Sequence, residues 1–217
     1  MTTSALTVVS SVSAVASAAA GGMMFVFSTF VMAGLDRAGP QDAIAAMRGI
    51  NAAAQTSGVF LLAYFGAALL AIAMGVMAVV ASTSGRGWLM AGAVLGVAGA
   101  VVTVVANVPL NDGLDAAAAT PDVWQAYLAS WTSWNHVRTV TSLVAAVLTM
   151  IRILRGPTTL DRLVALDVLI ALCMCGLGTW AAFSRDSTVV PAIVALALLS
   201  FVGSVSIARF RVRDDQT

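Results

Sequence analysis

The chain has 217 residues, of which 60% are hydrophobic and 10% charged, a composition typical of an integral membrane protein. Its 11 basic and 10 acidic residues leave a net charge of +1, which gives no sign of a protein that binds nucleic acid or acidic substrates. Cys173 and Cys175 are the only cysteines and would project in nearly opposite directions from a helix. Neither a disulfide nor a metal pair is therefore expected.

Three membrane-spanning helices are predicted in the first half of the chain, because about 20 apolar residues in a helix cross the ~30 Å hydrocarbon core. The first covers about residues 6–34. It is expected to be retained, because no positively charged segment precedes it as a signal peptide requires. The second covers about 57–82 and the third about 88–108, with a tight turn over Ser82–Gly87 between them.

Two polar connections flank these spans. Pro40 opens an amphipathic piece from Gln41 to Gln55, which is predicted to be an outer loop with a helical turn or two. A segment rich in Asn, Asp and Ala, from Pro109 to Pro121, is predicted to be a second loop. The third span carries a stripe of small residues that lets a neighbouring helix approach closely. The stripe consists of Gly92, Gly96 and Gly99.

Aromatic and polar side chains cluster after the second loop. The aromatic residues are Trp124, Tyr127, Trp131 and Trp134. They are typical of the belt at a membrane interface. A polar site is the alternative, because Trp131, Asn135 and Arg138 share one helical face at i, i+4 and i+7. His136 is the one histidine and a poor metal site alone, although its ordinary pKa suits a general acid or base.

The fourth, fifth and sixth helices are predicted from the second half of the chain. Two uncharged runs, Thr139–Ile151 and Val168–Ser184, reach the thickness of a bilayer only if neighbouring charged residues lie at an interface or inside the membrane. A third run, Ser187–Ala208, is long enough by itself. Six transmembrane helices result.

A turn separates the fourth helix from the fifth at Gly156-Pro157. Proline cannot continue a helix and biases its predecessor toward extended geometry, so the fourth helix is expected to end by Gly156. Thr158 or Thr159 can cap the next helix. Asp161 is then well placed in the first turn, as an acid beside Arg162 near the cap.

Asp167 lies about 9 Å deeper in the fifth helix than Asp161. A charged side chain near the bilayer centre costs roughly 2.5–3.5 kcal/mol, so such residues usually mark ion or proton handling. Two interpretations stay open. Asp167 can be neutralised by Arg155, by Arg162 or by another chain, or it can line a cation or proton path. A carboxylate suits a path because it can bind a sodium ion or a proton and change its charge.

The basic residues alternate between the two sides of the predicted membrane. One side carries Arg86, Arg152, Arg155, Arg162, Arg209, Arg211 and Arg213, and the other carries Arg37, Arg48, Arg138 and Arg185. Cytoplasmic loops hold the excess of basic residues in membrane proteins. Both termini are therefore predicted to lie in the cytoplasm.

Several segments of the first two thirds of the chain carry a family resemblance. They are Gly22-Met-Met-Phe-Val-Phe-Ser28 with Val31-Met-Ala-Gly-Leu35, Ala46-Met-Arg-Gly-Ile-Asn51, Asn107-Val-Pro-Leu-Asn-Asp-Gly-Leu-Asp115 and Trp131-Thr-Ser-Trp-Asn-His-Val-Arg-Thr139. Over about residues 6–150 the chain thereby resembles the anthrone oxygenase-like family of small membrane proteins. The resemblance implies a four-helix bundle and, in the few characterised relatives, cofactor-free oxygenation of a polyketide anthrone.

The last third carries a second resemblance. Its segments are Arg152-Ile-Leu-Arg-Gly-Pro-Thr-Thr-Leu-Asp-Arg-Leu-Val-Ala-Leu-Asp167 and Leu196-Ala-Leu-Leu-Ser-Phe-Val-Gly-Ser-Val-Ser-Ile-Ala-Arg-Phe210. Over about 138–213 the chain is similar to the F-type subunit of multisubunit Na+/H+ antiporters of the multiple resistance and pH type, a three-helix protein. That family usually has an acid near the start of its third helix, where Pro191 stands here. Any contribution of that acid is therefore absent.

The sequence thus predicts an all-α integral membrane protein in which an oxygenase-like unit, 1–150, and an antiporter F-type unit, 138–217, share the fourth helix. We expect an accessory antiporter subunit in the bacterial inner membrane. Its expected partners are other antiporter subunits, Na+, H+ and lipid, without cofactor, metal or nucleic acid. The predicted ion or proton path comprises Asp167, Asp161, Arg162 and Arg155, beside a structural turn of Gly156, Pro157 and Thr158.

Two alternatives remain. The first is an oxygenase-like membrane enzyme whose last helices are an anchor, and its predicted catalytic residues are Asn111, Asp112, Asn135, His136 and Arg138. The second is an artificial join of two unrelated genes, because the two resemblances share one helix and have no linker between them.

Overall fold

The computed structural model describes residues 3–82, 85–155, 159–185 and 187–210, and these residues form helices with no strand among them. This confirms the all-α class over the described ranges. The chain divides into two compact units, residues 1–149 and 150–217. Each unit is described by itself.

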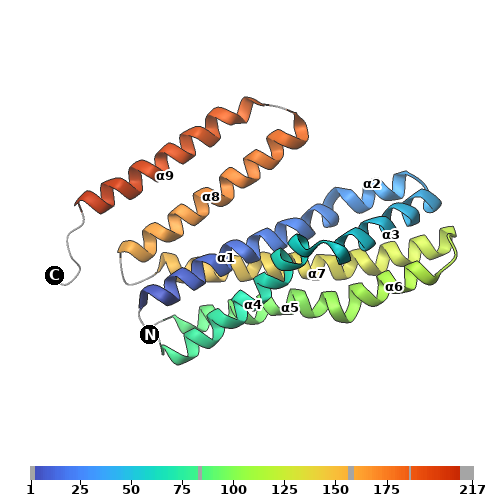
Figure 1. Ribbon diagram of the computed structural model, residues 1–217, viewed down its shortest axis with the longest axis horizontal. Helices are drawn as coiled ribbons and strands as arrows, with labels where there is room; N and C mark the ends of the chain where they lie inside the picture. Colours follow the sequence, from blue (N-terminus) through green and yellow to red (C-terminus); the bar gives the residue numbers. More distant parts are fainter. Residues whose placement is uncertain (1–2, 83–84, 156–158, 186, 211–217) are drawn as a thin grey trace. The chain divides into compact units, whose positions relative to one another are not determined.

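The first unit is a bundle of long helices that run back and forth along one axis (Figure 1). Two of them contain π-helical turns. Helix α1 (Thr3–Val26) continues through η1 (Phe27–Val31) into α2 (Met32–Arg37), and α5 (Arg86–Val102) continues through η2 (Thr103–Asn107) into α6 (Val108–Ala116). The bundle is completed by α3 (Pro40–Thr56), α4 (Gly58–Val80) and α7 (Pro121–Leu154).

Four helical stretches in the described residues are long and apolar enough to cross a membrane. They are Ala5–Arg37, Gly58–Val80, Arg86–Ala116 and Pro121–Leu154. The other two predicted spans fall on α8 (Thr159–Ser184) and α9 (Val190–Phe210), the second of which contributes a shorter apolar helix, Val190–Gly203. Six transmembrane helices and the side on which the termini lie therefore stay predictions.

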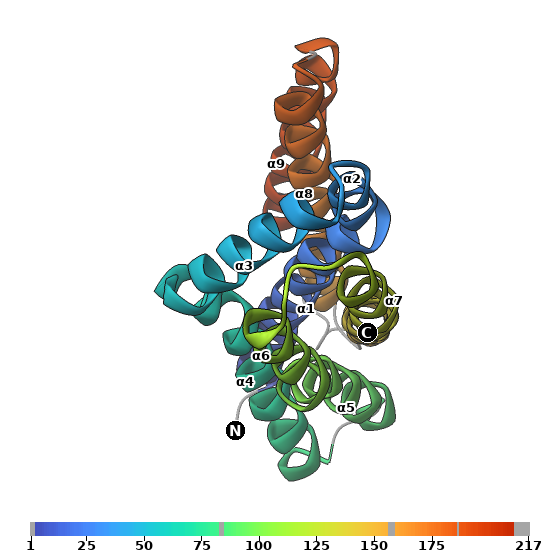
Figure 2. The same cartoon turned by 90° about the vertical axis from the view of Figure 1, so that its right-hand side faces the viewer.

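Helix α3 is a continuous helix of 17 residues, so the prediction of a loop with a helical turn or two was wrong. Its amphipathic face explains the difference, because Ile44 and Met47 are fully buried at that face. Arg48 fixes the helix from the other side, donating from Nη2 to Leu114 O and Ala117 O, both at 2.7 Å. Figure 2 shows α3 running outward from α2 before the chain returns into α4.

The segment from 109 to 121, predicted to be a loop, is helical as far as Ala116. Pro109 has no backbone N–H and would interrupt the hydrogen bonds of a regular helix. It lies in the first turn of α6, directly after the π-helical turn η2. The change of hydrogen-bond pattern at such a turn is a natural place for a proline, so the helix continues past it.

The core at the α3 end of the bundle contains three of the four aromatic residues that were predicted to form an interfacial belt. Trp124, Tyr127 and Trp131 are buried there, whereas Trp134 is 45% exposed. Trp124 also donates from Nε1 to Asp36 Oδ1 at 2.7 Å. The belt prediction was therefore wrong for these three, because α2, α3 and α6 cover them.

The small-residue stripe of α5 faces its neighbours as predicted. A Cβ atom at Gly92 would lie 2.7 Å from Thr149 Oγ1 of α7, and one at Gly96 would lie 2.9 Å from Ala71 Cβ of α4. Real side chains do not tolerate such distances without moving. Glycine thus sets how closely α5 packs between α4 and α7.

The second unit contains the antiparallel pair α8 and α9, joined through a short 3-10 helix, Ser187–Val189 (Figure 1). Helix α7 ends at Leu154 and α8 begins at Thr159, so the described helix ends agree with the predicted break. The predicted turn residues themselves, Gly156, Pro157 and Thr158, lie outside the described residues.

Candidate functional site

A cavity of about 590 Å³ lies within the first unit, between its helices at the α3 end. Its wall is mostly apolar and aromatic, with contributions from α1, η1, α3, α4, η2, α6 and α7. The aromatic residues of the wall are Phe27, Phe60, Tyr64, Phe65 and Trp131. A volume of this size is typical of a pocket for a drug-sized molecule.

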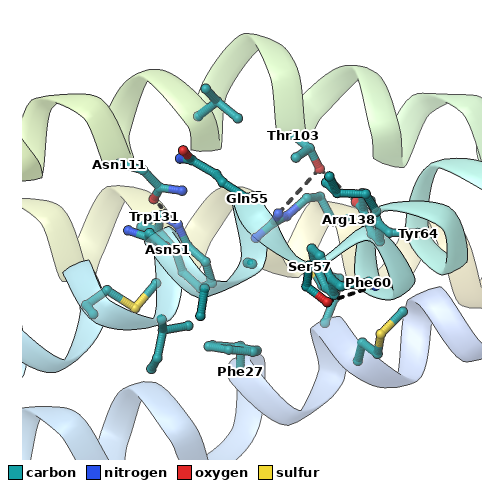
Figure 3. Close-up of a pocket in the computed structure, with 18 of the residues that line it drawn as sticks. Phe27, Asn51, Gln55, Ser57, Phe60, Tyr64, Thr103, Asn111, Trp131 and Arg138 are labelled. Atoms are coloured by element: carbon teal, nitrogen blue, oxygen red, sulfur yellow. Dashed lines mark hydrogen bonds between the residues drawn. The ribbon is translucent and has the colours of Figure 1, made fainter.

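Arg138 brings a cation to this apolar wall (Figure 3). Its residue is only 4% exposed. Nη1 donates to Thr103 Oγ1 at 3.3 Å, Nη2 donates to Asn135 Oδ1 at 2.7 Å, and the guanidinium lies 5.0 Å from the centre of the Trp131 ring. Nε has no hydrogen-bond partner, and in the part of the chain that the structure describes no carboxylate forms an ion pair with Arg138.

The depth of Arg138 follows from its neighbour Thr103. Tyr64 Oη lies 2.7 Å from the same Thr103 Oγ1, so Arg138 and Tyr64 stand at one level of the bundle. Tyr64 is about 9 Å beyond the start of α4 at 1.5 Å per residue. The guanidinium is therefore inside the spanning part of the bundle, where a buried charge is expensive and usually functional.

Asn135 holds Arg138 in place from the side of α7 that faces α1. Its side chain is fully buried, and Nδ2 donates to Met24 O at 2.8 Å and to Ser28 Oγ at 2.7 Å. Its Oδ1 is then the acceptor for Arg138. All the hydrogen-bonding atoms of the amide are thereby used, which orients the guanidinium toward the cavity wall.

Both π-helical turns of the bundle flank this arrangement. Ser28 belongs to η1 and Thr103 to η2, and each supplies a hydroxyl to the network around Arg138. π-Helical turns are rare and frequently occur at functional sites. Their coincidence at one level of the bundle favours a functional role for this end of the cavity.

Two asparagines line the cavity farther toward α6 and α3. Asn111 Oδ1 accepts from Tyr127 Oη and Trp131 Nε1, both at 2.9 Å. Asn51 is buried, and its Nδ2 has no hydrogen-bond partner. Like Arg138 Nε, this is a buried donor of the kind that usually finds an acceptor in a native protein.

The five residues predicted for an enzyme separate into two groups. Asn111 and Arg138 line the cavity, and Asn135 lies directly behind Arg138. Asp112 and His136 are exposed and do not line it. Within the described residues no group of three or more His, Cys, Asp or Glu side chains could hold a metal ion.

Tyr64, Thr103 and Asn51 were not predicted as site residues. Tyr64 and Thr103 are polar residues inside otherwise apolar runs. That pattern is a usable signal, because a polar group inside a membrane span needs a partner. Asn51 was noted only as part of the connection between two spans.

The second unit contains the other predicted site. Ser200 of α9 donates a hydrogen bond to Asp167 Oδ1 of α8, with an oxygen–oxygen distance of 2.5 Å. Asp167 is half-buried at this contact. The contact therefore joins the two helices of the pair by a short, charge-assisted hydrogen bond.

The remaining residues of the predicted path are placed only in part. Arg155 and Arg162 are exposed. The backbone of Asp161 belongs to the start of α8, and its side chain lies outside the described residues.

Two family models match different segments of the chain. The model of multiple resistance and pH regulation protein F (MrpF/PhaF) matches residues 160–211, and the anthrone oxygenase model matches residues 60–148. Both resemblances in the sequence are thereby confirmed over somewhat shorter ranges. The matched segments do not overlap.

Curated relatives match the last third of the chain. A protein of Staphylococcus haemolyticus named antiporter subunit mnhF2 is 39% identical over 67 residues, which are 31% of this chain and 67% of that protein. A Staphylococcus aureus protein of the same name is 34% identical over 80 residues, 35% of this chain and 80% of the relative. No solved structure matches the chain.

Proposed function

The chain belongs to the multiple resistance and pH regulation protein F (MrpF/PhaF) family, and we propose that it is an accessory membrane subunit of a multisubunit monovalent cation/proton antiporter. The single observation that supports this most is the match to two staphylococcal antiporter subunits over most of their length. The bacterial plasma membrane is its proposed location.

An accessory role suits the second unit better than complete transport. A complete antiporter must alternate the access of a coupled ion site between the two sides of the membrane. The α8–α9 pair offers one described carboxylate contact between helices, Asp167 with Ser200. The large partner subunits would supply the rest of the site.

Asp167 is the residue that we propose for the ion or proton path, or for assembly with the partner subunits. A carboxylate within an apolar helix pair can take up a proton or a sodium ion and change its charge as it does so. Asp161, Arg162 and Arg155, at the start of the same unit, complete the proposed path. The turn over residues 156–158 would set the direction of α8.

Copurification tests the proposal directly. The tagged full-length chain is extracted gently from its native membranes, and the proteins that accompany it are identified by mass spectrometry. We expect large polytopic antiporter subunits in stoichiometric amount. A chain that is recovered alone, under conditions that keep a known membrane complex of the same cells intact, would contradict the accessory role.

An oxygenase-like membrane enzyme is the second candidate. It is favoured by the anthrone oxygenase match over residues 60–148 together with a cavity that contains Arg138 and Asn111. In this proposal α8 and α9 anchor the enzyme, and Asp112, Asn135 and His136 complete the catalytic set. Substituting His136 by alanine would then reduce turnover without affecting tolerance of salt.

A further inference from the structure

Arg138 is a buried cation that lacks its counter-charge. Its guanidinium is held by two neutral oxygens, Thr103 Oγ1 and Asn135 Oδ1, and by the face of the Trp131 ring. Buried charges in proteins are normally paired with an opposite charge. In the described part of the chain Arg48 has such a partner in Asp115, and no acid serves Arg138 in this way.

A second unpaired donor lines the same cavity. Asn51 Nδ2, on α3, is buried without a partner, as is Arg138 Nε on α7. The two donors thus come from different helices of one wall. Asn111 Oδ1, by contrast, is occupied by Tyr127 and Trp131. Donors, and not acceptors, therefore remain for a guest molecule.

The rest of the wall selects an apolar guest. Methionine, phenylalanine and other apolar side chains dominate it, and the volume of about 590 Å³ suits one drug-sized molecule. A strongly hydrated ion alone would leave this surface unsatisfied. An apolar body that carries one oxyanion would satisfy the wall and the donors together.

We propose that the cavity binds one apolar molecule through a single oxyanion, a carboxylate or a phenolate, which accepts hydrogen bonds from Arg138 and Asn51. The bilayer can supply both chemistries, either as a single-chain fatty acid or as a dissolved aromatic acid. The site goes beyond the antiporter role, and it holds whether or not the bound molecule is turned over.

Matched pairs of ligands test the oxyanion. The full-length chain in detergent is titrated with a long-chain fatty acid or its methyl ester, and with a polycyclic phenol or its methyl ether, at a pH where both acids are ionised. Apparent Kd values follow from the rise in melting temperature. We expect at least one acid to bind about tenfold or more tightly than its capped partner, because a hydrogen bond to a charged group is lost on capping.

The two pairs also identify the source of the ligand. Preference for the fatty acid over its ester indicates a lipid-derived ligand, and preference for the phenol alone indicates an aromatic one. Equal binding within both pairs would overturn the proposal, since the oxyanion would then contribute nothing.

Three variants locate the effect. Arg138→Gln removes the cation, and Asn51→Asp keeps the shape of the side chain while placing a negative charge in the cavity. Each is expected to bring the ratio of acid to capped ligand down to about one. Arg37→Gln is the matched control, because Arg37 is exposed in α2 outside the cavity wall and its substitution removes the same charge.

The Asn51 variant also guards against loss of folding in Arg138→Gln. Each variant's melting temperature without ligand shows whether it is folded. An unchanged ratio in a folded Asn51→Asp or Arg138→Gln chain would place the binding elsewhere and refute the assignment.

Discussion

At the scale of single residues, Asp167 and Arg138 are opposite charges with different surroundings. Asp167 accepts a hydrogen bond from Ser200 in the α8–α9 pair. Arg138 has neutral partners and one unsatisfied nitrogen. Each charge belongs to a different compact unit and to a segment matched by a different family. Their substitutions are therefore expected to affect different properties of the protein.

Substitution of Asp167 by asparagine separates charge from shape. Asparagine keeps an oxygen that can accept from Ser200, so the helix pair is expected to persist while the titratable charge is lost. If Asp167 belongs to the path, cells that depend on this chain lose their tolerance of salt and alkali, measured as growth against a deletion strain. Normal tolerance with the Asp167→Asn chain present in the membrane would exclude a role for the charge.

Two further variants control this experiment. Ser200→Ala removes the donor but leaves the carboxylate, and interhelical hydrogen bonds of this kind contribute only about 0.6 kcal/mol on average. We expect a partial loss of tolerance. His136→Ala changes an exposed residue of the other unit and is expected to leave tolerance intact.

At the scale of helices, α5 depends on glycine for its position. A Cβ at Gly96 would lie 2.9 Å from Ala71 Cβ, whereas one at Gly22 of α1 would have nothing within 4 Å. Overpacking typically costs about 1–3 kcal/mol, and alanine gains about 0.5–1 kcal/mol over glycine in a helix. Gly96→Ala is therefore expected to lower the melting temperature in detergent.

Gly22→Ala is the matched control for this prediction. It introduces the same methyl group into open space, so only the gain in helix propensity remains. Its melting temperature is expected to be equal to or higher than that of the unaltered chain. If the two variants melted alike, the close approach of α4 to α5 at Gly96 would not limit packing.

The helices show how far sequence patterns reach. Runs of apolar residues predicted the spans of α4, α5 and α7, and proline at position 157 predicted the break before α8. The same reasoning missed α6 and the two π-helical turns. A π-helical turn changes the hydrogen-bond pattern while leaving the chain helical and the residues apolar, so no periodicity announces it.

The cavity could be predicted only in fragments for a related reason. Asn135 and Arg138 were placed together because they lie one turn apart on α7. Tyr64, Thr103 and Asn51 come from three other helical segments, and only tertiary packing brings them to the same wall. Their side chains carry no local pattern that would connect them.

At the scale of the whole molecule, two family matches on separate segments coincide broadly with two compact units. The boundary between the units falls near the end of α7. A continuous helix that enters both units makes a natural fusion plausible on physical grounds, because no flexible linker is needed to join them. Copurification of the full chain with antiporter subunits would support such a fusion over an artificial join.

Orientation in the membrane is the last property that the charges predict. The turn between α4 and α5 and the connection between α6 and α7 lie at opposite ends of the bundle (Figure 1). Arg86 stands beside the first of them, and six further arginines follow on the same predicted side of the membrane. The excess of basic residues places that side in the cytoplasm, and cysteine labelling can test it.

Cys173 and Cys175 are first replaced by serine, and single cysteines are then introduced at Ser82 and Ala118, both exposed. A maleimide that cannot cross the membrane is expected to label Ala118→Cys in intact cells, and Ser82→Cys only after the cells are opened. The reverse pattern would invert the protein. It would also move the α3 end, and with it the cavity around Arg138, to the cytoplasmic side, where its ligand would come from the inner leaflet.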